Sequence, residues 1–479
     1  MITFLKCIYI FSVAGLSLFG TLGLLTLWLY WHHRHETFPT PEVPTEGLPS
    51  VTVQLPIYNE RYVVKGLIET AVALQYPHHK LQIQVIDDST DDTTQIAAKL
   101  IEYHRRQGAN ISLIHRTKRH GYKAGALANA LNTATGEFVA IFDADFQPQS
   151  DFLLQTIPHF DNNPRLGAIQ ARWGHLNAQS SFLTRAQAIA LDKHFAMEQT
   201  VRHRANLFPK FNGTAGIWRL ACLEDAGGWL DDTVCEDLCL STRAVIKQWE
   251  FRFLNDVEVP AELPTSILAY KTQQARWAKG STQCLLKYGR PILNDKNHTL
   301  TARLYALLSM AGYTTHIFLL IMLLAQIPML YLDYRLPPQL IFFSIAGIGQ
   351  PLLFMLSQQA LHTDWHKRLP YLPILLLIAV GMTLSNARAI LQAIFNKNHA
   401  FIRTPKAGVN GSGPVKPIPY QLPFDPVIIG EIILSLYAGI GLILAIWRGN
   451  FGPIFFLLSI FIGSGYIAFL GLQELKHAQ

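Results

Sequence analysis

A run of 24 uncharged residues near the N-terminus restricts this chain more than any other feature of its sequence. Residues 8–31, IYIFSVAGLSLFGTLGLLTLWLYW, are enough to cross a bilayer as one helix. The run lacks a small-residue cleavage site and ends in aromatic residues followed by HHRH. These features favour an uncleaved anchor over a signal peptide, with the basic end in the cytosol.

The C-terminal part of the chain is apolar again. Hydropathy offers five candidate segments, 307–332, 339–361, 368–395, 425–447 and 452–473. The third has two prolines in a short apolar half and an amphipathic second half. If all five segments crossed the membrane, the basic loop 396–424 would face away from the cytosol, against the positive-inside tendency. We therefore predict that 368–395 lies in the membrane interface, which leaves four C-terminal spans and a cytosolic C-terminus.

The composition agrees with a chain that lies partly in lipid. Hydrophobic residues make up 50% and charged residues 15%, below the roughly 25% of soluble domains. The net charge of +7 suits an anionic small substrate or anionic lipid headgroups. No recognition module or basic helix indicates nucleic-acid binding. The five scattered cysteines predict reduced thiols in a cytosolic domain, and no second ligand pair accompanies Cys235 and Cys239 to make a zinc site.

Residues from about 39 to 290 read as a soluble α/β domain. Short continuous apolar runs at 50–58, 81–89, 111–116 and 138–145 are typical of strands buried on both faces. Helix-like stretches lie between them, so we predict a doubly wound, mostly parallel sheet. Ligands bind beyond the carboxyl ends of such strands. Four acidic residues fall at strand ends there: Asp87, Asp88, Asp143 and Asp145.

Two sequence stretches at these strand ends offer ligands for a phosphorylated substrate. The pair Asp143 and Asp145 after FVAIF can hold Mg²⁺ or Mn²⁺ shared with a diphosphate, although turn-forming aspartates give the same pattern. Asp87 and Asp88 can accept from a nucleobase or ribose. Basic residues around Gly121, including Lys123, can hold phosphate, whereas alone they would indicate a solvated loop.

The dipeptide Glu236-Asp237 in DTVCEDLCL is a candidate general base for an acceptor hydroxyl. A solvated acidic pair at a helix start is the alternative. The tetrapeptide Gln-Ala-Arg-Trp occurs twice, at 170–173 and at 274–277, but the flanking residues do not match, so the sequence does not favour an internal duplication.

The order of these motifs resembles that of the processive family 2 glycosyltransferases, the cellulose, chitin and hyaluronan synthases and their relatives. DD at 87–88, DAD at 143–145, ED at 236–237 and QQARW at 273–277 are similar to the D, DxD, ED and QxxRW series. QLPIYNE, GYKAGAL, FNGTAGIWR and AGGW look most like the plant cellulose-synthase-like A and C branches. FIRTPK at 401–406 resembles the gating-loop motif FxVTxK, with Arg403 in place of Val.

The resemblance implies a GT-A type nucleotide-sugar-binding domain and a role for each matching residue. Asp87 or Asp88 would contact the nucleotide, Lys123 and Asp143 the diphosphate, and Asp143 with Asp145 the metal. Asp237 beside Glu236 would be the base. The remaining implied residues are Gln273, Arg276 and Trp277 where acceptor and diphosphate meet, Asn212, Gly213 and Thr214 at the acceptor, and Phe401, Thr404 and Lys406 in the gating loop. Cys235 stands where cellulose synthases carry Thr, which puts acceptor contacts there in doubt.

Only the second QARW copy satisfies QxxRW, because the first has Ile169 where the second has Gln273. We therefore expect the first copy to be structural or peripheral to the acceptor. Gln273→Ala and Arg276→Ala should damage transfer far more than Gln170→Ala.

These inferences predict three domains: an anchor at 1–35, a cytosolic glycosyltransferase domain at 36–300 and a membrane domain at 301–479 with a gating-like loop at 396–424. The resemblance implies an inverting enzyme that polymerises sugar from GDP-mannose or UDP-glucose into β-linked mannan, glucomannan or glucan. A glycolipid synthase that adds one sugar to ceramide or diacylglycerol is the alternative, and a non-catalytic membrane scaffold is disfavoured by the intact motifs. The absence of long tails or a plant-type insertion favours a bacterial inner membrane.

Overall fold

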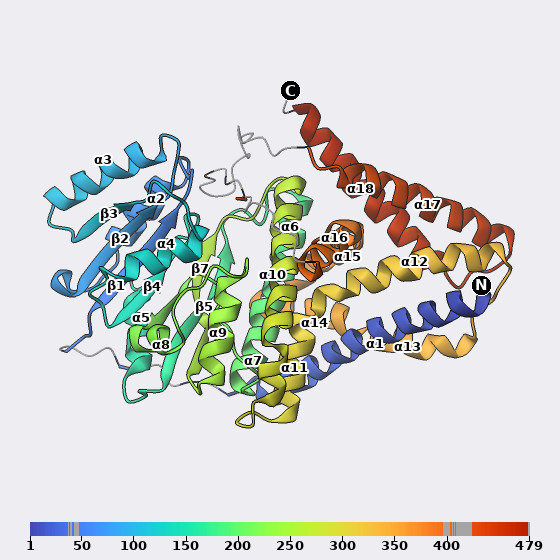
Figure 1. Cartoon of the computed structure of the whole chain (residues 1–479), viewed down its shortest axis with the longest axis horizontal. Helices are drawn as coiled ribbons and strands as arrows, with labels where there is room; N and C mark the ends of the chain where they lie inside the picture. Colours follow the sequence, from blue (N-terminus) through green and yellow to red (C-terminus); the bar gives the residue numbers. More distant parts are fainter. Residues whose placement is uncertain are drawn as a thin grey trace.

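An α/β unit and a set of long apolar helices make up the structure, a computed structural model that describes residues 1–36, 38, 41–42, 47–395, 403–404, 406, 408 and 424–477. Figure 1 shows the α/β unit at the left, with the apolar helices extending to the right. The long helices α10 and α11 stand between the two parts. Their bounds are Ile267–Asn294 and Leu300–Met310.

The α/β unit is built on one seven-stranded sheet with the order β3-β2-β1-β4-β6-β5-β7. All neighbouring strands pair in parallel except β6, which is antiparallel to both β4 and β5. The predicted mostly parallel sheet is therefore confirmed, with one reversed strand. The strands are β1 Val51–Ile57, β2 Leu81–Asp87, β3 Ile111–His115, β4 Phe138–Ile141, β5 Leu166–His175, β6 Gly216–Arg219 and β7 Glu250–Ala261.

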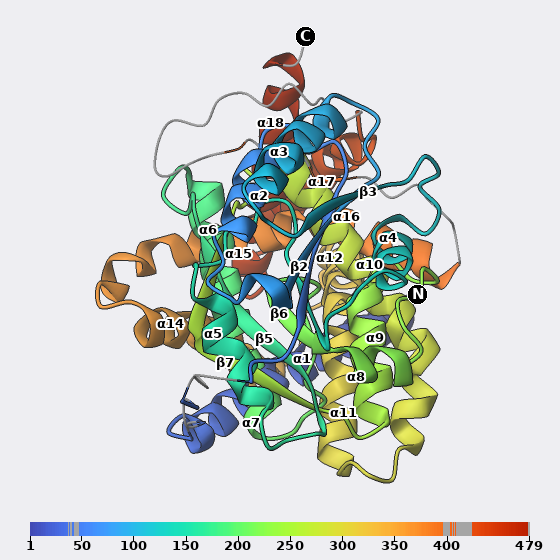
Figure 2. The same ribbon diagram turned by 90° about the vertical axis from the view of Figure 1, so that its left-hand side faces the viewer.

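Helices cover both faces of the sheet, as the continuous apolar strands require. Alternate residues of β4 belong to different cores: Phe138 and Ala140 join one hydrophobic cluster, and Val139 and Ile141 join the other. Helices α2 and α3 pack on the first face and α4 on the second (Figure 2). Their bounds are Val64–Val72, Thr93–Arg106 and Tyr122–Leu131.

The second half of the α/β unit contributes further helices that lead to the membrane-type part. These are α5 Phe152–Thr156, α6 Phe182–Asp192, a π-helical segment Lys193–Gln199, α7 Thr200–Arg204, α8 Leu220–Asp225 and α9 Glu236–Ile246. Figure 2 shows α8 and α9 close together, to the right of β5 and β7.

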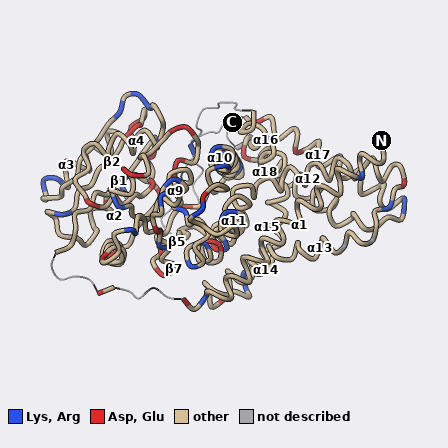
Figure 3. The backbone as a smooth tube through the Cα atoms, turned by 60° about the horizontal axis from the view of Figure 1, so that its bottom comes forward, with Lys and Arg blue, Asp and Glu red and all other residues tan. Residues whose placement is uncertain are grey.

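Four described helices are long and apolar enough to span a membrane: α1 at Ile2–His33, Gly312–Tyr331, which includes α12 Thr315–Tyr331, α17 at Val427–Trp447, and α18 at Ile454–His477, of which Ile454–Lys476 qualifies. They agree with four of the predicted spans. Figure 3 shows Lys, Arg, Asp and Glu throughout the α/β unit, whereas the middle stretches of the long apolar helices carry few of them and charged residues return at the far ends.

The predicted span at 339–361 is wrong, because the structure divides it into two short helices, α13 Ile341–Ala346 and α14 Gly349–Leu361. The break contains Gly347 and is followed by Gly349 at the start of α14, and glycine is a poor helix former. It also meets α1 closely, since a Cβ on Gly20 would lie 2.4 Å from the Ala346 carbonyl oxygen. An unbroken straight helix is therefore disfavoured at this point both by propensity and by packing.

Segment 368–395 forms a bent pair of helices, α15 Leu372–Gly381 and α16 Thr383–Ile394. The two helical stretches, Trp365–Gly381 and Thr383–Ile394, meet at 45° and together are apolar enough for a broken span. The described residues thus hold four spanning-type helices, or five if this pair counts as one. The interfacial position of 368–395 stays a prediction.

The expectation of reduced thiols is wrong for one pair. Cys239 on α9 and Cys284 on α10 are joined by a disulfide with their Cα atoms 5.9 Å apart. The two cysteines are 45 residues apart, so the sequence alone does not indicate that α9 and α10 lie side by side. Cys7, Cys222 and Cys235 remain free.

Candidate active site

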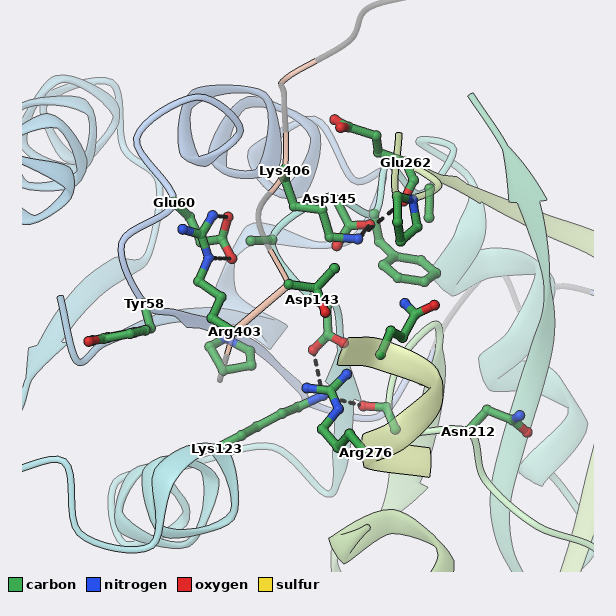
Figure 4. Close-up of a pocket in the computed structure, with 18 of the residues that line it drawn as sticks. Tyr58, Glu60, Lys123, Asp143, Asp145, Asn212, Glu262, Arg276, Arg403 and Lys406 are labelled. Carbon is green, nitrogen blue, oxygen red and sulfur yellow. Dashed lines mark hydrogen bonds and ion pairs between the residues drawn. The ribbon is translucent and has the colours of Figure 1, made fainter. Parts of the chain in front are cut away.

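A cavity lies beyond the carboxyl ends of β1, β2 and β4, where the sequence predicts a ligand site (Figure 4). Most of the predicted site residues line it together. They are Asp88, Lys123, Asp143, Asp145, Asn212, Gly213, Glu236, Asp237, Gln273, Arg276, Trp277, Thr404 and Lys406. Residues separated by more than 300 positions thus meet in one place.

The two aspartates that follow β4 are each paired with a lysine. Lys123 Nζ lies 2.5 Å from Asp143 Oδ1 and also donates to the Gly213 carbonyl at 2.9 Å. Lys406 Nζ lies 2.6 Å from Asp145 Oδ2. Burial disfavours the charged form of Lys123, but the carboxylates of Asp143 and Glu236 raise the pKa of Lys123 above its ordinary value. The cation predicted to face a diphosphate is therefore held charged at the strand end.

Of the adjacent aspartates 87 and 88, only Asp88 is among the described residues that line the cavity. Arg116 Nε donates to Asp88 Oδ1 at 2.7 Å, and Arg116 Nη2 donates to Asp88 Oδ2 at 2.5 Å. Asp87 is fully buried, and its oxygens accept from Ser89, Thr94 and the His115 ring. Asp87 bonds the segment that follows β2 and the end of β3, so of the two aspartates Asp88 stays the predicted nucleotide contact.

The acidic pair Glu236 and Asp237 begins α9, with both side chains at the cavity. Burial raises the pKa of Glu236 to about 7, against the lowering influence of Lys123. Burial also raises the pKa of Asp237, opposed by the Leu238 backbone N–H. Gly213, at φ +82°, permits close approach: a Cβ there would lie 3.1 Å from Asp237 Oδ2. Raised pKa values in a cleft are typical of acid–base groups.

These shifts predict a pH dependence with a definite sign. A general base must be ionised, so transfer should slow as the pH falls below neutrality, because the pKa of Glu236 is about 7 and that of Asp237 lies above its ordinary value. The initial rate should be measured from pH 5 to 8.5 at saturating donor. An acidic limb near pH 4, the ordinary carboxyl range, would contradict the prediction.

The Asn212-Gly213-Thr214 loop is held by buried hydrogen bonds. Asn212 Oδ1 accepts from Gln199 at 2.5 Å, and its Nδ2 lies 2.8 Å from the His194 ring. Asn212 and Gly213 line the cavity, whereas Thr214 is fully buried and its hydroxyl accepts from the Asp143 backbone N–H at 2.8 Å. The predicted acceptor contact of Thr214 is therefore corrected to support of the DxD segment.

The two QARW copies lie on different elements. Gln273, Arg276 and Trp277 share one face of α10 at helical spacing, and all three line the cavity. The first copy lies on β5, where Gln170 is buried and accepts from the Asn212 backbone N–H at 2.7 Å. Arg172 binds Glu258 and the Asn255 carbonyl. Neither residue is among the described residues that line the cavity, and their role as structural or peripheral to the acceptor stays a prediction.

Trp173, the last residue of the first copy, lines the cavity between Phe146 and Phe195, both with ring centroids 5.1 Å away. Sequence reasoning did not assign it to the site. The signal was present, since side chains alternate along a strand and Trp173 differs in face from Arg172.

The gating-like segment enters the cavity from the C-terminal part (Figure 4). Besides the Lys406 contact, Arg403 forms a fork on Glu60 at 2.8 and 2.5 Å. Burial raises the pKa of Glu60 to about 7, against the lowering influence of Arg403. Phe401 lies outside the described residues. Four cavity residues were not predicted from the sequence: Glu60, whose partner Arg403 is 343 residues away, and Tyr58, His175 and Glu262.

Comparisons with known proteins agree with this arrangement. Residues 52–218 match the model for glycosyl transferase family 2, and residues 138–357 match that for glycosyl transferase family group 2. The chain is 41% identical over 273 residues to glucomannan 4-beta-mannosyltransferase 9 of Arabidopsis thaliana, covering 56% of this chain and 51% of the relative. It is 43% identical over 264 residues to glucomannan 4-beta-mannosyltransferase 1 of Cyamopsis tetragonoloba, covering 54% and 50%. The chain thus spans about half the length of these curated relatives.

A similar solved structure is that of a mannosyltransferase from Pyrobaculum calidifontis in complex with GDP-Man and Mn²⁺. The TM-score is 0.56 at 22% identity, and the match covers 82% of this chain and 100% of the other. This likeness, with the sheet order described above, identifies the α/β unit as a GT-A type fold.

Proposed function

Because residues 52–218 and 138–357 match the models for glycosyl transferase family 2 and family group 2, we propose that the chain is an inverting, nucleotide-sugar-dependent hexosyltransferase that lengthens a β-linked mannan or glucomannan. The observation that carries the proposal is the convergence in one cavity of the DxD aspartates, the Glu236-Asp237 pair and the QxxRW residues. Each set alone has a structural explanation, but all three around one space match what a single sugar transfer requires.

In the proposed reaction Asp237 accepts the proton of an acceptor hydroxyl, whose oxygen attacks the anomeric carbon as the bond to the nucleotide diphosphate breaks. The diphosphate gains negative charge as it leaves. Lys123 and Arg276 line the same cavity and are suited to stabilise that charge. Trp277 offers an aromatic face to a sugar ring. Attack opposite the leaving group inverts the anomeric configuration.

Asp143 and Asp145 would hold a divalent cation. Their carboxylates are hard oxygen ligands at the cavity wall, and each now neutralises a lysine ammonium, so the position suits positive charge. Within the described residues no group of three or more His, Cys, Asp or Glu side chains that could hold a metal ion is found. When bound, the cation would offset the charge of the leaving diphosphate.

Chelation should therefore stop the reaction. We expect dialysis against EDTA to reduce mannose transfer by at least about 10²-fold and added Mn²⁺ or Mg²⁺ to restore it. Adding Zn²⁺ or Ca²⁺ at the same concentration checks which ion the site accepts. Full activity after chelation, with metal content verified by elemental analysis, would contradict the metal site.

The donor is proposed to be GDP-mannose, because the curated relatives are named as glucomannan 4-beta-mannosyltransferases. Purified full-length protein in detergent or vesicles is incubated with radiolabelled GDP-mannose or UDP-glucose, and released nucleotide and product are measured. We expect release from GDP-mannose and an ethanol-insoluble product that an endo-β-mannanase degrades. Product that dissolves only in chloroform would instead identify the glycolipid alternative.

We propose the domain division 1–35, 36–300 and 301–479, with the catalytic domain in the cytosol and the apolar helices in the membrane. The four spanning-type helices support a membrane location. A polymer made on the cytosolic side needs a route across the bilayer, so we also propose translocation through the helical part. The relatives named above come from plants, and the predicted bacterial inner membrane gains no support from them and stays a prediction.

A further inference from the structure

The helix that carries QxxRW is capped by a residue from the last helix of the chain. The Glu474 carboxylate on α18 accepts from the backbone N–H of Ile267 at 2.6 Å, that of Leu268 at 3.2 Å and the Ser266 hydroxyl at 2.6 Å. The first N–H groups of a helix have no partner inside it, and negative charge is favourable at that end. A side chain 207 residues away from Ile267 therefore completes the start of α10.

A buried ion pair fastens the next turn of the same helix. Lys271 Nζ lies 2.6 and 2.8 Å from the two carboxylate oxygens of Glu431 on α17. The side chains are only 4% and 0% exposed. A buried charge without its partner is strongly destabilising, so separation of α10 from α17 at this point would cost much free energy. Lys271 lies two residues before Gln273 and five before Arg276.

Another face of α10 packs closely against the start of α9, the helix that carries the proposed base Asp237. A Cβ on Gly280 would lie 2.1 Å from Cys235 Sγ, so only glycine permits this approach. The Cys239–Cys284 disulfide joins the same two helices further along. Helix α10 is thus confined between α9, which carries Asp237, and the C-terminal apolar helices. Any shift of α10 along its axis would move Arg276 and Trp277 relative to Asp237.

We propose that Glu431 and Glu474 are positioning residues of sugar transfer, which hold the QxxRW face of α10 in register with the base on α9. Neither glutamate lines the cavity, so each acts only through α10. This inference rests on the proposed function. It assigns part of the catalytic geometry to two helices of the membrane-type region.

The test uses full-length protein carrying Glu431→Gln or Glu474→Gln. Both variants should lower kcat for mannose transfer by about 10-fold or more, because small misplacements of catalytic groups are costly. The KM for GDP-mannose should stay within about twofold, since Asp88, Lys123 and Asp143 lie on other elements and Arg276 acts mainly on charge that grows during the reaction. The reversed pair Lys271→Glu with Glu431→Lys should recover most of the lost kcat. The matched control is Lys287→Met on the same helix, whose pair with Asp232 is 38% and 42% exposed and should not matter.

Hydrogen exchange of residues 266–280 gives a readout that does not depend on activity. It should be faster in both glutamate variants and unchanged in Lys287→Met. If Glu431→Gln does not fold, Lys271→Met with Glu431→Leu replaces the ion pair by apolar contacts and should fold but keep a low kcat. Wild-type kcat and unchanged exchange in the folded variants would overturn the proposal. If wild-type protein transfers no sugar, the proposed function fails, and unchanged exchange alone then overturns this inference.

Discussion

Asp237→Asn should abolish sugar transfer while leaving GDP-mannose binding within about twofold of wild type. The amide keeps the size of the side chain and its place at the start of α9, but it cannot take up the acceptor proton. Loss of a general base costs roughly 10²–10⁴-fold in rate. The measurement is nucleotide release at saturating donor and acceptor, paired with the Kd for GDP-mannose from calorimetry.

The neighbouring carboxylate provides the matched control for this experiment. Glu236→Gln removes a charge from the same helix turn and should reduce the rate less than Asp237→Asn does. A wild-type rate in Asp237→Asn would remove Asp237 as the base. A larger loss in Glu236→Gln than in Asp237→Asn would transfer that role to Glu236, whose side chain lines the same cavity.

Arg276→Ala should lower kcat by about 10²–10³-fold, the usual effect of removing one group that stabilises developing negative charge. Arg276 lies in the cavity with Lys123 and the two DxD aspartates, where the diphosphate would leave. The donor KM should change less than kcat, because the charge grows during the reaction.

The other QARW copy offers a control of the same chemistry. Arg172→Ala removes hydrogen bonds to Glu258 and the Asn255 carbonyl and should cost about 1–3 kcal/mol of folding stability. It should leave the kcat of the folded protein within about threefold of wild type. Equal losses of kcat from the two arginine variants would contradict the assignment of separate roles to the two copies.

The hydrogen bonds of Gln170 alter the effect expected from its replacement by alanine. The sequence indicates only that it lies outside QxxRW, but its amide joins the Asn212 backbone N–H to the Thr214 and Ala215 carbonyls. Gln170→Ala would leave these buried groups without partners and disturb the Asn212 loop. Its effect on transfer should therefore be larger than the sequence pattern alone predicts, though still indirect.

Local patterns were sufficient for the elements and for most of the site. Continuous apolar runs predicted strands β1 to β4, and uncharged runs predicted α1, α12, α17 and α18. The position of DxD and ED at element ends, with the resemblance, predicted which residues meet. Chain geometry explains this success, because the carboxyl ends of parallel strands share one edge of the sheet.

Which of two adjacent residues faces the cavity depended on the tertiary structure. Asp87 and Asp88 have the same side chain, but the pleat turns one into the loops and the other into the cavity. The glycine-containing break near residue 347 interrupts a run that hydropathy reads as continuous.

A membrane-type part, a doubly wound α/β unit and a set of carboxylates at strand ends could be predicted from the amino-acid sequence, since periodicity and apolar length are local properties. The distant partners that build and support the site became known from the folded chain. Arg403 on Glu60, Glu474 at the start of α10 and Cys239 bonded to Cys284 all join segments that no local pattern relates. Their pairing follows from how helices pack around the sheet, a property of the whole fold.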